Sequence, residues 1–287
     1  MPARELDRAC GEEDEFGVKQ WKRVLVLVLV GLALLLAGSF IAVDWVILLF
    51  GVQTIYAGVA KPVMSLLCLL LVLLIGKDGI DRSDTILLVI AFLFILPVDV
   101  LMSIVALSPE IGVASPAFMT GGVLSIVAHL VLLVRHGRGF PYLRSGYRRE
   151  RGRAALGSFL WLPVLVFGLW ALVLLPLLGP MIRIGHLLIG LVYSGLVVTS
   201  TWVAWETVRF GLYPRRSAWL VGVAMTCWFA TEIVGEIYNI QIGRISDLAF
   251  NFVWIFYGTT ILCLALSGYR WSARESSPSG RGRQRAG

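Results

Sequence analysis

The sequence predicts an all-α membrane protein, a bundle of eight transmembrane helices with both termini in the cytoplasm. Its composition is the first reason, because 58% of the residues are hydrophobic and only 15% are charged. Charged residues make up about 25% of an ordinary soluble domain. The second reason is that eight apolar segments are long enough to cross a bilayer core, which takes about 17 to 25 residues. The third is that the basic residues gather in alternate loops.

The eight predicted spans cover residues 24–50, 54–76, 85–107, 116–134, 154–178, 186–205, 217–237 and 248–268. The first span follows an N-terminal tail, residues 1–23, that carries six acidic and five basic residues. This tail does not fit the positive start of a cleavable signal peptide, so we expect a retained span. Its alternative end is Val43, with residues 45–50 at the interface. Five tryptophans lie near predicted span ends, as is typical of the membrane interface: Trp21, Trp45, Trp205, Trp219 and Trp271.

The loops between the spans set the orientation, because short loops rich in Lys and Arg remain in the cytoplasm. With an inside N-terminus, 22 of the 25 lysines and arginines fall in inside segments, seven of them in residues 135–153. The outside loops hold only Arg183 and Arg244, and Lys61 lies within the second span. The tail after residue 268, rich in Gly, Ser and Arg, is predicted to be a disordered cytoplasmic extension. We therefore expect a multi-pass integral membrane protein, in the cell or inner membrane if the source is bacterial.

The positive charge favours membrane lipids over nucleic acid as partners. The formal net charge is +7, and residues 135–153 and 281–285 are rich in arginine. Positive-inside bias and anionic lipid headgroups account for both segments, since each basic residue near a membrane surface gains about 1 kcal/mol. No base-reading module accompanies the charge.

The cysteines and histidines predict no metal and no cofactor. The four cysteines form no CxxC pair. The three histidines are scattered over both ends of the predicted bundle, whereas a catalytic zinc needs three or four ligands at one depth. This argues against a zinc-dependent lipid hydrolase. The GxSxG, HExxH, Walker and GxGxxG motifs are also absent from the sequence.

Ionisable residues inside the predicted spans give the strongest functional signal, and the deepest are Lys61, Asp99, His129 and Glu232. A charged residue at the centre of a span costs about 2.5 to 3.5 kcal/mol on insertion scales. Such residues therefore face the bundle interior and have partners. Counted from the inside ends, Lys61, Asp99 and Glu232 reach the same depth of about 21 to 22 Å, whereas His129 lies near the inner face. We expect the three charges in one pocket in the outer half of the membrane, with a purely structural ion pair as the alternative.

Five segments carry a family resemblance, at residues 56–71, 87–102, 118–134, 221–235 and 256–267, and the family they resemble is the YhhN family of lysoplasmalogenases. YAGVAKPVMSLLCLLL (56–71) is similar to the Lys-Pro start of that family's second helix, and LLVIAFLFILPVDVLM (87–102) to its third-helix segment ending in Gly-Asp. FMTGGVLSIVAHLVLLV (118–134) is similar to its Phe, Gly and His pattern. VGVAMTCWFATEIVG (221–235) resembles its seventh-helix Ser-Asp segment, and FYGTTILCLALS (256–267) its last helix. The resemblance spans residues 54–268, and the chain departs from the pattern at Val98, Leu132, Thr231, Glu232 and Thr260.

The resemblance implies hydrolysis of the vinyl ether bond of a lysoplasmalogen, a lysophospholipid, to a fatty aldehyde and a glycerophospho-alcohol. A carboxylic acid must protonate the outer carbon of the C=C bond, and a carboxylate must stabilise the resulting oxocarbenium ion, as paired carboxyls do in glycosidases. Asp99 is expected to hold the proton and Glu232 to be the carboxylate. Lys61 would pair with the ionised carboxylate or hold the lipid phosphate. The other residues expected to bind the substrate are Tyr56, Tyr238, Asn251 and His129.

Two other functions would use the same residues. A proton-coupled small-molecule transporter would also place a lysine and two acids at mid-membrane, and proton-coupled uptake by reconstituted vesicles would identify it. An inactive relative that binds lipid or acts as a scaffold would tolerate neutral substitutions at Lys61, Asp99 and Glu232 with a loss of stability alone.

Overall fold

A computed structural model describes residues 21–22, 24–43, 56–107, 115–138, 152–183, 185–211, 213–242 and 247–270. Among these residues every regular element is a helix, and Gly79 and Tyr269 form an isolated antiparallel bridge. The helix over Val24–Val43 is followed by α2 (Tyr56–Ile75), η1 (Gly76–Asp78), α3 (Arg82–Leu107), α4 (Pro116–Gly137), α6 (Gly152–Arg183), α7 (Leu187–Phe210), α8 (Arg215–Ile242) and α9 (Asp247–Ser267). The all-α class is confirmed, and a helix lies at each of the eight predicted spans.

The surface of the bundle is that of an integral membrane protein. Within the described ranges, six helices are long and apolar enough to cross a membrane: Val24–Val43, Gly58–Ile75, Arg82–Val105, Pro116–Gly137, Trp161–Arg183 and Leu187–Phe210. Their outer sides expose large apolar residues, such as Leu35 at 69% and Leu172 at 70%. Water would penalise so much exposed apolar area, whereas lipid does not. The chain is therefore a multi-pass membrane protein.

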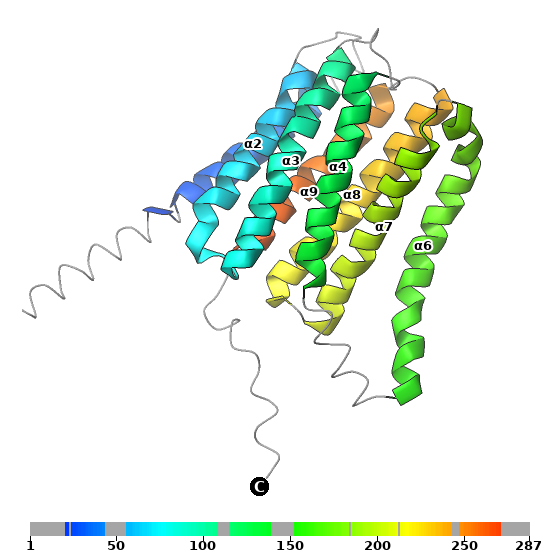
Figure 1. Cartoon of the computed structure of the whole chain (residues 1–287). Coiled ribbons are helices and arrows are strands. Elements are labelled where there is room, and N and C mark those ends of the chain that lie inside the picture. Colours follow the sequence, from blue (N-terminus) through cyan, green and yellow to red (C-terminus); the bar gives the residue numbers. More distant parts are fainter. Residues whose placement is uncertain are drawn as a thin grey trace, which may run out of the picture.

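Six of the described helices pack into a closed ring, in the order α2, α3, α4, α7, α8, α9 and back to α2. The N-terminal helix packs outside this ring, where Ala37 approaches Gly258 of α9. Helix α6 also lies outside, because it contacts only α7 and α8 closely, and Figure 1 shows it at one edge of the bundle. The ring creates a central region that side chains from six helices can reach.

Several helix ends meet at one face of the bundle, which we call the Asp84 face. The end of α2 and the start of α3 lie beside the end of α9, since the backbone N–H of Ile80 donates to Gly268 and that of Arg270 to Asp78. The end of α4 and the start of α8 lie at the same face, because Arg135 and Tyr213 both contact Asp84. Helices α2, α4, α7 and α9 therefore end at this face, and α3 and α8 begin there.

A fully buried ion pair between Arg135 and Asp84 holds the Asp84 face together. The guanidinium donates from Nε to Oδ1 at 2.9 Å and from Nη2 to Oδ2 at 2.8 Å, and its Nη1 donates to Ser267 at 3.0 Å. The hydroxyl of Tyr213 lies 3.0 Å from Asp84 Oδ1 and 2.8 Å from the carbonyl of Arg135. The sequence predicts Arg135 in a basic loop after residue 134, but α4 continues to Gly137 and carries this side chain inside. One cluster thus ties α3, α4, α9 and the segment between α7 and α8.

The rim of the same cluster is more exposed. Arg138 donates to Asp81 at 3.1 Å, and the backbone N–H of Asp84 donates to Asp81 at 2.7 Å. Partial burial alone would raise the pKa of Asp81, but these donors and the positive charge of Arg138 outweigh it and lower the pKa. Asp81 therefore stays ionised at neutral pH and caps the start of α3.

Tyr213 makes the Asp84 face sensitive to alkali. Burial, assisted by the charge of Asp84 and opposed by that of Arg135, raises the pKa of Tyr213 to about 12. A pKa raised by folding gives stability that is complete below the unfolded value near 10 and is lost as the pH rises through 12. We expect the stability advantage of wild type over Tyr213→Phe to shrink by about 2 to 3 kcal/mol between pH 10 and pH 12. Denaturant titrations in detergent at pH 9 to 12 measure this, and a constant difference would contradict it.

Candidate functional site

The carboxyl of Asp99 is enclosed by donors from two neighbouring helices. Asp99 lies on α3 with 1% of its surface exposed. Its Oδ2 accepts hydrogen bonds from Ser65 of α2 and, at 2.5 Å, from the hydroxyl of Tyr257 of α9. Its Oδ1 lies 3.7 Å from Nζ of Lys61. Lys61 and Ser65 are four residues apart on α2 and so share the face that meets Asp99.

Lys61 contacts Tyr257 as well as Asp99. Its Nζ lies 4.5 Å from the centre of the Tyr257 ring, so the ring that donates to Asp99 also packs against the ammonium. The lysine side chain is 17% exposed. Asp99 and Lys61 thus form an ion pair, and this pairing offsets part of the cost of holding both charges in the bundle.

The carboxyl of Glu232 has a different set of partners. Its Oε1 accepts from the hydroxyl of Tyr193 of α7 at 2.6 Å and from the indole N–H of Trp228 at 3.2 Å. The same indole lies 3.2 Å from the Tyr193 oxygen, so the three groups form a triangle. No donor among the described side chains reaches Oε2. This carboxyl is therefore bound on one oxygen only.

His129 of α4 packs edge-on against both donors to Glu232. Its ring centre is 4.3 Å from that of Trp228 and 5.4 Å from that of Tyr193. It is fully buried, and within the described residues neither ring nitrogen has a hydrogen-bond partner.

Counting residues from the inside ends of the spans predicts His129 near the inner face and away from Glu232. In the structure His129 lies close to the partners of Glu232, for two reasons. Helix α4 extends to Gly137, beyond the predicted end of the span, which raises His129 by about 4.5 Å. Side chains also tilt toward the N-terminus of their helix. Because α4 and α8 run in opposite directions, His129 leans away from the Asp84 face and Trp228 leans toward it, so the two rings meet.

The two carboxyl sites join in one polar layer. The ring centres of Trp228 and Tyr257 are 6.4 Å apart and the ring planes meet at 75°. The structure thus brings together Lys61, Asp99, His129 and Glu232. The polar layer consists of these four residues with Ser65, Tyr193, Trp228 and Tyr257.

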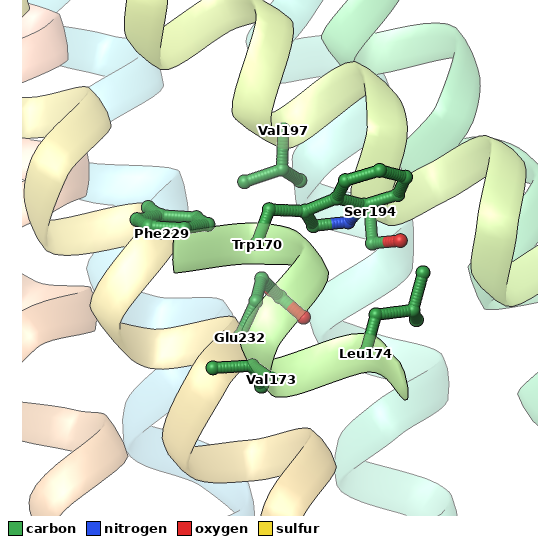
Figure 2. Close-up of a pocket in the computed structure, with 7 residues that line it drawn as sticks. All are labelled: Trp170, Val173, Leu174, Ser194, Val197, Phe229 and Glu232. Atoms are coloured by element: carbon green, nitrogen blue, oxygen red, sulfur yellow. The ribbon is translucent and has the colours of Figure 1, made fainter. Parts of the chain in front are cut away.

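A hollow between α6 and the α7–α8 pair reaches the polar layer at Glu232. It is lined by Trp170, Val173, Leu174, Ser194, Val197, Phe229 and Glu232, and Figure 2 shows these side chains facing one another across the gap between their helices. Its empty volume is about 280 Å³, including the part open to the outside. Asp99 and Lys61 are not among its lining residues, so the described hollow serves one carboxyl rather than the expected three charges.

Sequence reasoning missed four members of the polar layer. Ser65 and Trp228 each lie four residues from an ionisable residue, Lys61 and Glu232, so helical spacing alone could have indicated them. Tyr193 and Tyr257 come from other helices, and their contacts depend on the closure of the ring. Three predicted substrate-binding side chains, those of Tyr56, Tyr238 and Asn251, lie outside the described part of the structure.

The described residues contain no group of three or more His, Cys, Asp or Glu side chains that could hold a metal ion. The polar layer offers two carboxyls, one ammonium and several hydroxyl and indole donors. Comparisons with protein-family models, with curated proteins and with solved structures found no match to this chain.

Proposed function

We propose that the chain is an integral-membrane lipid hydrolase of lysoplasmalogenase type, with eight spans and both termini in the cytoplasm. The observation that carries the proposal is that two carboxyls of one polar layer have unlike surroundings. Asp99 is enclosed by an ammonium and two hydroxyls, whereas Glu232 borders an apolar hollow and its Oε2 has no donor among the described side chains. Pairs of carboxyls with unlike surroundings are typical of acid–base catalysis.

The proposed orientation rests on the Asp84 face. The loops or tails that leave this face are those that carry most of the lysines and arginines of the chain, including residues 135–153. Positive-inside bias then assigns the Asp84 face to the cytoplasm. The exposed pair of Lys22 with Asp78 brings the start of the N-terminal helix to the same face, as an N-terminus inside requires.

The contacts favour an exchange of the roles expected from the sequence. Lys61, Ser65 and Tyr257 already occupy both oxygens of Asp99, so it is the weaker candidate for delivering a proton to a substrate. Glu232 borders apolar side chains and keeps Oε2 without a donor, which suits a protonated acid facing a substrate. We therefore assign the proton to Glu232. Asp99 then fixes Lys61 and Tyr257, and Tyr257 in turn packs on Trp228, which donates to Glu232.

The reaction that follows from this assignment is protonation of carbon. Glu232 gives its proton to the outer carbon of the vinyl ether, and the C=C electrons form the new C–H bond, which leaves an oxocarbenium ion. The new carboxylate of Glu232 stabilises this cation and accepts a proton from the water that attacks it. The hemiacetal then collapses to the fatty aldehyde and the glycerophospho-alcohol. Lys61 contributes to this scheme as the partner of Asp99, the role that its contacts support.

The test is aldehyde release by purified protein reconstituted in liposomes with lysoplasmenyl-ethanolamine. In D₂O the aldehyde should carry one deuterium on the carbon next to the carbonyl, because the acid delivers solvent-derived deuterium there. The saturated ether analogue should not react, since it has no C=C bond to protonate. Asp99→Asn should lower kcat by about 10²-fold or more, because Lys61 and Tyr257 would no longer be held in place by the carboxylate. Wild-type protein that releases no aldehyde would remove the assignment.

A matched variant separates loss of chemistry from loss of folding. Asp78 lies at the Asp84 face, about half exposed, in a surface pair with Lys22. Asp78→Asn makes the same chemical change as Asp99→Asn far from the polar layer, and it should leave aldehyde release at the wild-type rate.

A further inference from the structure

Helix α6 is packed separately from the rest of the bundle. The main apolar core draws its buried residues from the N-terminal helix and the six helices of the ring, and none of them comes from α6. The buried residues Leu174, Leu177 and Met181 of α6 form a small cluster of their own, and the residues packed against it are Trp170, Val173 and Leu178 of α6 and Leu187 and Leu191 of α7. This attachment lies at the end of α6 that is remote from the Asp84 face. There the Met181 side chain packs directly on Gly190.

Two prolines follow the hollow on the way to this attached end. Pro176 and Pro180 lie inside α6, and each removes a backbone N–H that would bond the carbonyl four residues earlier. Pro163 lies inside α6 as well, on the other side of the hollow, so the backbone of the helix is weakened both before the hollow and between the hollow and Met181. Kinks in helices form at such positions.

The polar groups on the two sides of the hollow do not satisfy one another. The indole N–H of Trp170 is buried without a hydrogen-bond partner in the described part of the chain, and Glu232 Oε2 has no donor there. If this seam never opened, these polar groups would stay without hydrogen-bond partners, and that would cost free energy. An occupant with hydrogen-bonding groups would satisfy them, and Figure 2 shows Trp170 and Glu232 on the border of the same space.

The opposite side of α6 faces lipid. Val164, Leu165, Leu169 and Leu172 are all exposed, between 45% and 70%. Lipid chains therefore cover the outer side of the helix directly behind the hollow. A displacement of this part of α6 would admit a lipid chain without passage through water or through the main core.

We propose that α6 is a lateral gate that bends at Pro176 and Pro180 and opens the seam beside Glu232, so that a membrane lipid reaches this carboxyl directly from the bilayer. The proposal rests on the proposed function for the identity of the lipid but not for the motion. The moving part of α6 lies on the side of Trp170 that is nearer the Asp84 face, where Phe167 contacts Trp202 with ring centres 6.3 Å apart.

The test labels Glu232 with dicyclohexylcarbodiimide, an apolar reagent that adds to protonated carboxyls, and uses two cross-links between α6 and α7. In a background with the native cysteines replaced by alanine, Phe167→Cys with Trp202→Cys is joined by a short reducible bis-methanethiosulfonate to lock the moving end. Met181→Cys with Gly190→Cys is joined in the same way to lock the attached end. Neither cross-link lies among the residues that line the hollow. Glu232→Gln identifies the labelled peptide by mass spectrometry.

The lock at the moving end should lower labelling at Glu232 at least ten-fold, with recovery on reduction, and the lock at the attached end should leave it unchanged. Water-soluble carbodiimide should not label Glu232 in any variant. No labelling of Glu232 in the unlocked protein, or equal labelling in all three, would overturn the gate. Aldehyde release in the same preparations separates the two proposals: release without gated labelling retains the hydrolase, and gated labelling without release retains the gate.

Discussion

Glu232→Gln is expected to lower kcat for aldehyde release by about 10²- to 10⁴-fold, the usual contribution of a general acid. Glutamine keeps the shape of the side chain, and its carbonyl oxygen can still accept from Tyr193 and Trp228. It cannot deliver a proton to carbon. Because the substrate still enters the hollow, KM should change little, and the loss should appear in kcat and kcat/KM together. Steady-state kinetics with lysoplasmenyl-ethanolamine measure both.

Glu206 supplies the matched control for this substitution. It is a second buried glutamate, on α7, and its Oε1 accepts from the indole of Trp202 at 3.1 Å and lies 3.7 Å from Arg209. Glu206→Gln makes the same chemical change outside the polar layer and should retain the wild-type kcat. Equal losses in the two variants would assign the effect to folding, and full activity in Glu232→Gln would end its role as the acid.

Asp84→Asn and Arg135→Met are each expected to lower the free energy of unfolding by about 3 to 5 kcal/mol. Either change leaves the other member of a fully buried bidentate pair without its counter-charge. Asp84→Leu combined with Arg135→Met removes both charges and should cost much less than the sum of the single changes, because apolar side chains pay no desolvation penalty. Unfolding by sodium dodecyl sulfate in mixed micelles, followed by far-UV circular dichroism, measures these differences.

The exposed ion pair of Lys22 with Asp78 at the same face gives a reference for the effect of removing a surface pair. Lys22 and Asp78 approach to 3.4 Å with about a third and a half of their side chains exposed. Lys22→Gln should change stability by no more than about 1 kcal/mol, the range for surface ion pairs. A cost for Arg135→Met that is no larger than that for Lys22→Gln would show that the buried pair contributes little.

The helices were predictable because their signal is local. A run of about 20 apolar residues is sufficient to indicate a span, and helices lie at all eight predicted positions. The signal fails at the ends, where a buried arginine resembles a loop arginine. The sequence predicts Arg135 in a cytoplasmic loop because nothing nearby in the sequence indicates its partner. That partner is Asp84, 51 residues earlier, whose carboxylate accepts hydrogen bonds from the guanidinium.

Only the ionisable residues of the site were predictable from the sequence. An ionisable residue in a lipid-length segment is conspicuous, and Lys61, Asp99 and Glu232 were identified on that basis. Their neutral partners give no such signal, since tyrosine and tryptophan are common in membrane helices. Whether Tyr257 meets Asp99 or the lipid depends on which helices neighbour each other in the ring, and hydropathy does not contain that information.

The closed ring has a consequence for biosynthesis. Its closing contact joins α2 to α9, the first and the last of its helices to leave the ribosome. Until α9 is inserted, Asp99 lacks the phenol of Tyr257 and Arg135 lacks the hydroxyl of Ser267. The ion pairs of these two residues can form earlier, but their hydrogen bonding is complete only when the last helix has entered the membrane, so insertion of α9 finishes the polar layer and the Asp84 face together.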